Sequence, residues 1–418
     1  MIMIFSNKQT FWVVLLTSFQ FFFSFGLSCF FNPLQASLIQ DFHLNPGALG
    51  FLSSLFFYAE LSLVIPAGLL VDRVSPVRVT SCGIILLTIS VAMMALASDW
   101  MTLVAARLLM GLGAGVQFAG CVRVLANWLK PQELGSGFSL LVAMGFLGGM
   151  LMQMPLASLI HWIGWREALW VLVVVGLMIL AMVNLWVSDL PNSRVSSQAS
   201  ITVNVLSLKK RLGLVLKSRQ NVLSGFYVGL LNLPVFMFGA LWGIAYLETV
   251  DRLSNLQAAT ICSMIFLGFM IGGPIFGYVS DHIGKRVWLM RVWALLSLIL
   301  VVILVQIHFT SYVVLLGLYL LLGMIISVQN LAYPLVVESS ARHVASSATA
   351  VISIISLTTG GAIAQPLFGF LVAYFNHGQS GNAIGYERAI WIMPIAFLMA
   401  LILSFGLREP DRQSMDEH

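Results

Sequence analysis

The sequence predicts an all-α polytopic membrane protein with twelve transmembrane helices in two pseudo-symmetric six-helix halves. Of its 418 residues, 59% are hydrophobic and only 9% are charged. Apolar runs of roughly 20 residues, the length that crosses the hydrocarbon of a bilayer, recur from end to end. A repeat is also visible, because Gly68 and Gly277 lie half a chain length apart and so do Asp72 and Asp281. Together these features indicate a duplicated membrane domain.

Twelve apolar segments lie between polar or turn-rich breaks. Each is expected to be a helix, because a bilayer offers no partner to exposed backbone groups and the two-residue alternation of a membrane barrel is missing. In chain order the segments cover residues 10–39, 47–71, 78–97, 101–127, 135–160, 167–188, 222–247, 256–280, 287–307, 312–337, 345–375 and 389–407.

The first segment is expected to be a true span. Its apolar run from Phe11 to Ile39 is longer than a cleaved secretion signal and lacks a small-residue cleavage site near its end. All four cysteines fall inside apolar runs, which favours packing over a disulfide framework: Cys29, Cys82, Cys121 and Cys262.

The longest polar interval divides six spans from six. It covers 189–221 and contains Pro191, a serine-rich patch and a basic run from Lys209 to Arg219. We therefore expect an N-terminal half at 1–190, a cytoplasmic central loop at 191–220 and a C-terminal half at 221–418.

Basic residues set the orientation. With the amino terminus inside, sixteen Lys and Arg residues face the cytoplasm and only Arg166, Arg252 and Arg388 lie outside. Such an excess is typical of inside loops. Both termini are therefore expected in the cytoplasm, with the chain in the inner membrane as a monomer. The net charge of +5 then reports topology and requires no nucleic-acid partner.

Two short inside loops, after spans 2 and 8, carry the repeated charges. The first contains Gly68, Asp72, Arg73 and Arg78, and the second Gly277, Asp281, Gly284, Lys285 and Arg286. Glycine allows close helix approach, and an aspartate at a helix end can meet backbone donors or a base. We expect these clusters to latch the inner side while a carrier faces out. Ordinary surface charges explain each residue but not the repeat.

The loops resemble the Gly-x-x-x-Asp-Arg/Lys-x-Gly-x-Arg/Lys pattern of the major facilitator superfamily. Ser75 replaces the glycine in the first copy, and Arg78 comes one place late. "RLLMGLGAG" from Arg107 and "GWREALW" from Gly164 resemble the family's signatures in span 4 and at the start of span 6. The resemblance covers nearly the whole chain and implies alternating access around a solute site near the midplane.

Fragments at 65–73, 336–350 and 360–371 are similar to a branch of metabolite carriers within this family. The branch includes lysosomal dipeptide-transporter-like proteins and bacterial nutrient-uptake relatives. Proton-driven drug exporters of the family carry Gly-x-x-x-Gly-Pro-x-x-Gly in span 5. Here Met150 follows Gly149 and the proline is delayed to Pro155, which weakens the exporter interpretation.

Charge deep in a span is costly and is a functional candidate by default. Glu60 lies roughly 18 Å of helix before Asp72, near mid-membrane, and is the acid expected to carry a coupled proton. Arg107 is a candidate for the solute cavity, and Arg123 is expected to be structural. A permanent Glu60–arginine pair is the alternative, with coupling left to a loop-end acid such as Asp41 or Glu338.

Neutral side chains complete the expected cavity, because they share faces on spans 1 and 10 or lie in the interrupted span 7. They are Gln20, Ser24, Ser28, Asn232, Trp242, Tyr246, Ser327 and Asn330. Such a cavity favours a small polar or zwitterionic solute such as an amino acid, dipeptide or nucleoside. Helix-to-helix hydrogen bonding is the alternative role for each of these residues.

The chain is therefore predicted to be a proton-coupled secondary transporter. Efflux of drugs or siderophore-like metabolites and uncoupled facilitation are the alternatives. An enzyme is not expected, because no His-Glu-x-x-His or Gly-x-Ser-x-Gly motif occurs. No phosphate-binding glycine-rich loop is present, so an ion gradient rather than ATP is the expected energy source. No cofactor, metal or catalytic residue is predicted; the expected partners are the solute, protons and the lipid bilayer.

Overall fold

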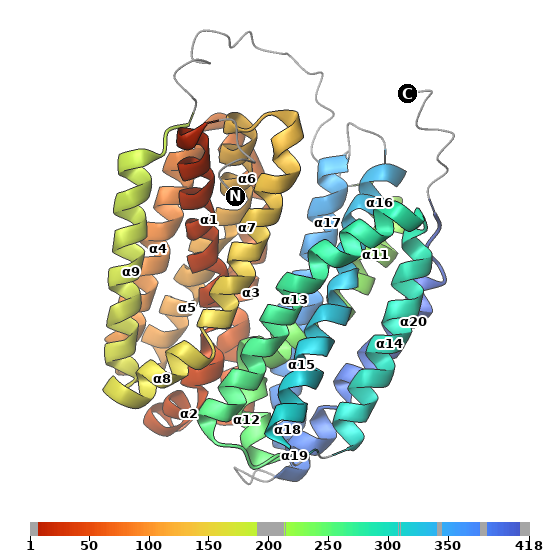
Figure 1. Ribbon diagram of the computed structural model, residues 1–418. Coiled ribbons are helices and arrows are strands. Elements are labelled where there is room, and N and C mark those ends of the chain that lie inside the picture. The colour runs from red at the N-terminus through yellow and green to blue at the C-terminus, as the bar shows by residue number, and fades with distance from the viewer. Residues whose placement is uncertain are drawn as a thin grey trace.

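The computed structural model describes residues 7–189, 213, 215–307, 309, 311–340, 345–376 and 383–409. Within these residues the regular secondary structure is helical and contains no strand. The helices form two bundles, one from each part of the chain (Figure 1). The predicted all-α membrane fold is confirmed.

Twelve helical segments of the described chain are long and apolar enough to cross a membrane, as predicted. Spans 1 to 6 are built from α1 (Lys8–Cys29), α3 (Pro46–Arg73), α4 (Pro76–Ala95), α5 (Trp100–Gly115) with α6 (Gln117–Trp128), α7 (Pro131–Leu151) with α8 (Met154–Ile163), and α9 (Trp165–Trp186).

Spans 7 to 12 form the second bundle. They are built from α11 (Arg219–Leu231) with η2 (Pro234–Trp242) and α12 (Gly243–Thr249), α13 (Asn255–Ile283), α14 (Arg286–Gln306), α15 (Tyr312–Ile326) with η3 (Ser327–Leu331) and α16 (Ala332–Ser339), α17 (Ala345–Leu357) with η4 (Thr358–Ile363) and α18 (Ala364–Phe375), and α19 (Ala383–Ala389) with α20 (Ile392–Ser404). The central loop predicted at 191–220 falls largely outside the described residues, so the domain boundaries stay predictions.

Span 1 differs from its prediction, which gave one helix over 10–39. α1 ends at Cys29, and a second helix, α2 (Phe31–Phe42), begins after Phe30. Pro33 explains the break, because it has no N–H to donate to the carbonyl of Cys29 four residues earlier. That carbonyl instead accepts a hydrogen bond from Nε2 of Gln153, at 3.2 Å. A side chain from span 5 thus completes the end of α1.

Spans 7 and 11 each contain a π-helical stretch, η2 and η4. The sequence predicts an interruption of span 7 around Pro234 and Gly239, and η2 confirms it. Single π-helical turns are rare and occur frequently at functional sites. Both stretches lie at the face where one bundle meets the other.

The two bundles meet at the centre of the molecule and at one of its two ends. We call the end where α1 begins and α20 ends the inner end, following the predicted orientation; the bundles diverge toward it (Figure 1). At the outer end, a Cβ on Gly50 of span 2 would stand 2.8 Å from the carbonyl oxygen of Gln365 in span 11. At the inner end, nothing lies within 4 Å of a Cβ added to Gly68 or Gly277. The structure is closed on the outer side.

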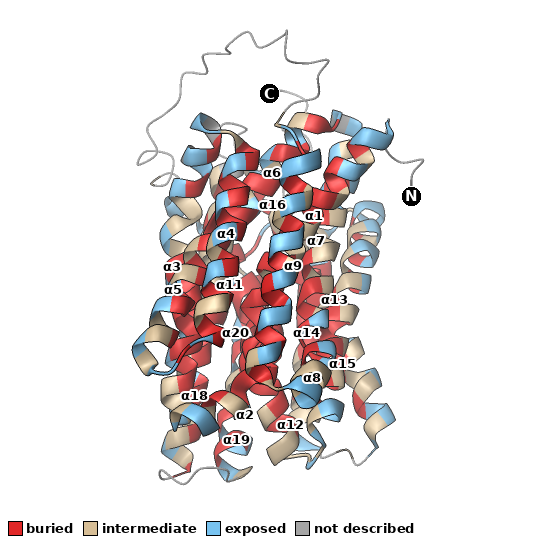
Figure 2. Cartoon of the chain, turned by 90° about the vertical axis from the view of Figure 1, so that its left-hand side faces the viewer, coloured by how far each residue is buried: buried red, intermediate tan, exposed pale blue. Residues whose placement is uncertain are grey.

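The outward surfaces of the spans suit a lipid environment. A stripe of exposed residues runs along α9 (Figure 2). Most of its members are apolar and include Trp170, Val174 and Leu177, which are 43%, 54% and 52% exposed. Apolar side chains on this scale at a soluble surface are unusual, whereas lipid tails are a natural neighbour for them.

Thiol labelling tests the orientation. Cysteines placed at Ser98, Glu248 and Asn376 are expected to react with an impermeant reagent added outside cells, because these positions lie at or just after the predicted outer ends of spans. Cysteines at Gln132 and Ser339 are expected to stay unlabelled until the membrane is permeabilised. The opposite pattern would invert the topology.

Candidate functional site

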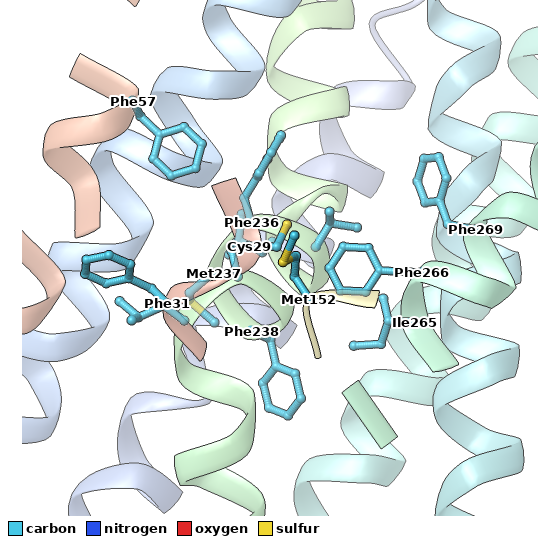
Figure 3. Packing of buried hydrophobic residues seen from close by; sticks show 14 of the residues in the cluster. Cys29, Phe31, Phe57, Met152, Phe236, Met237, Phe238, Ile265, Phe266 and Phe269 are labelled. Carbon is cyan, nitrogen blue, oxygen red and sulfur yellow. The ribbon is translucent and has the colours of Figure 1, made fainter. Parts of the chain in front are cut away.

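Aromatic rings from both bundles close the centre of the molecule. Phe236 of η2 lies between Phe57 of span 2 and Phe266 of span 8 (Figure 3). The ring centroids of Phe57 and Phe236 are 5.5 Å apart. Phe146 of span 5 stacks on Phe269 of span 8 with centroids 4.1 Å apart. These pairs join the halves, so the aromatic cluster separates the inner side from the outer side near the midplane.

Asn32 of α2 makes the main polar link between the halves. Its Nδ2 donates to the carbonyl oxygen of Gly239 at 2.9 Å, and its Oδ1 accepts from the backbone N–H of Ile244 at 3.0 Å. Nδ2 also donates to Oε1 of Gln153 at 2.9 Å. Sequence reasoning missed Asn32, although its position just before Pro33 marks a helix break where a polar side chain finds unpaired backbone groups.

Two glycines allow the backbones of spans 2 and 11 to cross beside this link. A Cβ on Gly369 would overlap the carbonyl oxygen of Pro46, and Gly50 faces Gln365 in the same way. Below them, the hydroxyl of Tyr58 donates to the carbonyl oxygen of Ala362 at 2.8 Å. We call the cross-half contacts of Asn32, Gly50 and Gly369 the outer seal.

Glu60 follows Tyr58 on span 2 and lies against span 4. A Cβ on Gly115 would stand 2.9 Å from the carbonyl oxygen of Glu60. The side chain of Glu60 is partly buried. Within the described chain its carboxylate makes no hydrogen bond or ion pair, so the alternative role, a pair with an arginine, is not formed in this state.

The two loop-end acids are paired. Arg166 donates from Nη1 to Oδ2 of Asp41 at 2.6 Å, and this hydrogen bond holds the pKa of Asp41 below its usual value. Arg286 donates from Nη2 to Oε1 of Glu338 at 2.6 Å. Each of these two carboxylates is held by an arginine, whereas Glu60 has no such partner within the described chain. Glu60 is therefore the better placed of the three to exchange a proton.

Arg107 is enclosed within the N-terminal bundle. Its guanidinium donates to the carbonyl oxygens of Ser53 at 3.3 Å and Leu27 at 3.2 Å. The rings of Phe31 and Phe56 lie 4.0 and 4.8 Å from its central carbon. The side chain is 0% exposed. In this state Arg107 ties spans 1, 2 and 4 together and is closed to a solute, whereas the sequence placed it on a cavity face.

The three candidates on span 1 are also buried. Gln20 is 0% exposed, and Ser24 and Ser28 are each 4% exposed. Ser28 donates to the carbonyl oxygen of Phe25 in its own helix at 2.7 Å. The amide of Gln20 has no hydrogen-bond partner within the described chain. Helical periodicity thus grouped these residues on one face, and that face packs inside the protein.

The candidates on spans 7 and 10 divide into two groups. Asn232 is partly buried and accepts a hydrogen bond from Nε2 of Gln329 at 3.1 Å; Asn330 is also partly buried. The others are buried: Ser327, Trp242 and Tyr246. Trp242 donates from Nε1 to the carbonyl oxygen of Gln365 at 3.0 Å, beside the outer seal. Asn232 and Asn330 remain the best candidates for contact with a solute from the inner side.

The second inside loop forms a charge network around Arg286. Arg286 donates to Oδ1 of Asp281 at 3.1 Å as well as to Glu338, and so connects the inner ends of spans 8 and 10. Gly284 ends α13 in the left-handed conformation, with φ of 68°. In the first loop Ser75 caps α4, Arg73 and Arg78 are exposed, and the side chain of Asp72 lies outside the described part. With the inner ends apart, the described network stays within one half.

A second repeat at the inner end escaped sequence reasoning. Oδ1 of Asp189, just after span 6, accepts from the N–H of Val77 at the start of span 3, at 2.9 Å. Oε1 of Glu409, just after span 12, accepts from the N–H of Val287 at the start of span 9, at 2.7 Å. Anionic caps stabilise helix N-termini. The sequence feature that indicates these caps is an acidic residue shortly after the last span of each half.

Asp281→Asn is expected to slow transport while leaving the protein folded. Asp281 is largely exposed, and exposed ion pairs contribute about 0–1 kcal/mol, so stability changes little. The predicted latch, in contrast, would form only when the inner ends meet. Initial uptake rates in proteoliposomes measure the effect, with the neighbouring His282→Gln as control. A normal rate in both Asp281→Asn and Asp72→Asn would rule out the latch.

Comparison with known proteins places these features in a family. The model of the Major Facilitator Superfamily matches residues 14–365.

Within the described residues, no group of three or more His, Cys, Asp or Glu side chains is placed to hold a metal ion.

Three curated proteins illustrate the sequence relatives. The probable galactarate/D-glucarate transporter GudP of Escherichia coli is 24% identical over 68% of this chain and 67% of its own length. The nitrate/nitrite transporter NrtP of Nostoc punctiforme is 32% identical, but over only 35% of this chain and 28% of its own length. The probable sulfoacetate transporter SauU of Cupriavidus necator is 23% identical over 59% of each chain.

Solved structures show the same fold. A bacterial homologue of the human lysosomal transporter Spinster, in an inward-facing and occupied conformation, superposes with a TM-score of 0.78 at 14% identity. The match covers 96% of this chain and 97% of that one. A point mutant of the nucleoside transporter NupG gives a TM-score of 0.75 at 14% identity, over 94% of this chain and 99% of that one.

Proposed function

The chain belongs to the major facilitator superfamily, and we propose that it moves a small polar organic solute with an anionic group across the inner membrane by alternating access, coupled to protons. Both termini lie in the cytoplasm in this proposal. The family and the relatives are transporters rather than enzymes.

The observation that supports alternating access is the asymmetry of the contacts between the halves. Described hydrogen bonds and ring contacts between them lie at the midplane and the outer end, while the inner ends stand apart. A carrier must also reach the opposite arrangement, closed inside and open outside. The repeated inside loops supply residues that would hold that second state.

The solute class is supported by the names of the relatives. Galactarate, D-glucarate, nitrate and sulfoacetate are anions, and the two relatives with the broader matches carry organic ones. An amino acid or dipeptide, the class expected from the sequence, also carries a carboxylate. Asn232 and Asn330 are amides that would hydrogen-bond such a group from the inner side.

Proton coupling rests on Glu60. Protonation of Glu60 at mid-membrane removes a charge that is costly in a low-dielectric environment. The protein is therefore expected to change between its inward-open and outward-open states more easily when Glu60 is protonated than when it is ionised. A proton that accompanies an anionic solute would also reduce the net charge moved. Glu60 is the acid near mid-span for which the described chain provides no hydrogen-bond or ion-pair partner.

A thermal-shift screen of purified protein tests the solute class directly. A ligand that binds the folded form stabilises it by about 2.7 kcal/mol at one hundred times its Kd. We expect hits among D-glucarate, sulfoacetate and amino acids, and none among lipophilic cations. Hits confined to lipophilic drugs would favour the exporter alternative and contradict the proposal.

A further inference from the structure

The side chain of Asn32 bonds to a helix that belongs to the other half of the protein. In η2 the backbone follows the π pattern, and Gly243 donates its N–H to the carbonyl of Phe238 five residues earlier. The next pair in that pattern is the N–H of Ile244 and the carbonyl of Gly239. Both groups are bonded to the amide of Asn32, at 3.0 and 2.9 Å.

This arrangement uses both ends of one amide. Nδ2 donates to Gly239 and to Gln153, and Oδ1 accepts from Ile244. Asn32 is 1% exposed, so water does not replace these bonds in the closed state. A buried backbone group that loses its partner is strongly destabilising, which ties the position of Asn32 to the conformation of span 7.

We propose that Asn32 is the positioning residue of the outer seal and that span 7 holds its π segment only while Asn32 is inserted. The inference rests on alternating access as the proposed function. When the outer end opens, α2 withdraws from span 7 and takes Asn32 with it. The freed groups then find partners within the helix by shifting to the α pattern, in which Ile244 bonds to Ala240 and Gly243 to Gly239.

The register shift connects the outer seal to the midplane. Changing the hydrogen-bond register by one residue rotates the part of the helix after the π segment by about 100° relative to the part before it. Phe236, in contact with Phe57, lies within the π segment, and Asn232 lies just before it. Insertion of Asn32 would thus close the outer end and set the positions of Phe236 and Asn232 in one step.

Asn32→Leu tests the proposal, because leucine has a similar size but leaves Gly239 and Ile244 facing an apolar side chain. Spin labels are placed in opposite halves after replacement of the four native cysteines. The outer pair is Met101 and Val313, which are 72% and 73% exposed. The inner pair is Trp12 and Trp288, at 54% and 51%.

We expect the outer distance to lengthen and the inner distance to shorten, with a shift of roughly tenfold or more in the ratio of outer-open to outer-closed molecules. Unfolding would lengthen both distances and is thereby recognised. The matched control is Asn184→Leu, because the bonds of Asn184 stay within the N-terminal half: it donates to Leu180 at 2.8 Å and accepts from Ser81 at 3.4 Å. That variant is expected to keep the parent distances.

Asn32→Asp separates the donor role from the packing role. A protonated aspartic acid retains a donor for Gly239 and an acceptor for Ile244, whereas the ionised form has acceptors only. The outer pair is expected to be closed at acid pH and open at alkaline pH, reversibly. The distance measurement needs no solute. The role of Asn32 can therefore be refuted while transport is observed, and it can be supported while the proposed solutes are not transported. Unchanged distances in both variants would overturn the role of Asn32.

Discussion

Gly369→Ala is expected to abolish uptake and hold the outer end of the protein open. The added Cβ would overlap the carbonyl oxygen of Pro46 and stand 2.8 Å from the ring of Trp242. Neither neighbour can turn away, because Pro46 contributes backbone and Trp242 is fully buried. Overpacking of this kind costs about 1–3 kcal/mol. Trp242 lies in the same half as Gly369, but Pro46 lies in the other half, so the overlap with Pro46 falls only on the closed state. That cost corresponds to a shift of about 5- to 150-fold toward the open state.

A matched control separates this effect from a general intolerance of alanine. Gly317 of span 10 has nothing within 4 Å of an added Cβ, so Gly317→Ala is expected to transport normally. The outer spin-label pair described above reports the state of the seal in both variants. If Gly369→Ala keeps the closed distance and the parent rate, the outer seal is not required for the cycle.

Glu60→Gln is expected to lose proton-driven accumulation while retaining exchange of solute across the membrane. Glutamine resembles the protonated carboxyl in shape and polarity but cannot release a proton. The variant therefore behaves as a carrier fixed in the loaded form, and counterflow continues. Uptake into proteoliposomes is measured with and without an imposed pH difference, alongside counterflow of labelled solute.

Two other carboxylates provide controls for Glu60. Glu248 near the outer end of span 7 accepts a hydrogen bond from Asn255 at 2.9 Å, and Asp41 is paired with Arg166. Glu248→Gln and Asp41→Asn are expected to accumulate solute in response to the pH difference. If Glu60→Gln does so as well, Glu60 is a structural residue and the coupled proton is carried elsewhere.

The twelve spans could be predicted because the bilayer imposes a length and an apolar composition on each helix separately. The Arg286 network could be predicted in part, since duplication singled out the loops that contain it. Breaks within spans were harder to predict than the spans themselves. Pro33 carries a local signal, but a proline at this position also fits one kinked helix.

The cross-half contacts could not be predicted from periodicity. Asn32 and Gly239 are 207 positions apart, and no pattern along the chain indicates that they meet. The same limit explains why Arg107, Gln20 and Ser24 were predicted to line a cavity but are buried. A helical face can be grouped by angle, but the direction of that face depends on neighbours that belong to other spans. In the structure, the face that carries these residues points into the interior of the N-terminal bundle.

Uptake into proteoliposomes tests whether the protein moves an anionic solute together with protons. Purified protein is reconstituted, and labelled D-glucarate, sulfoacetate and amino acids are supplied outside vesicles whose lumen is more alkaline than the medium. We expect that at least one of these solutes accumulates above its outside concentration and that a protonophore abolishes the accumulation. Uptake no faster than in protein-free vesicles for every solute, from a preparation whose spin-label distances show both states, would contradict it.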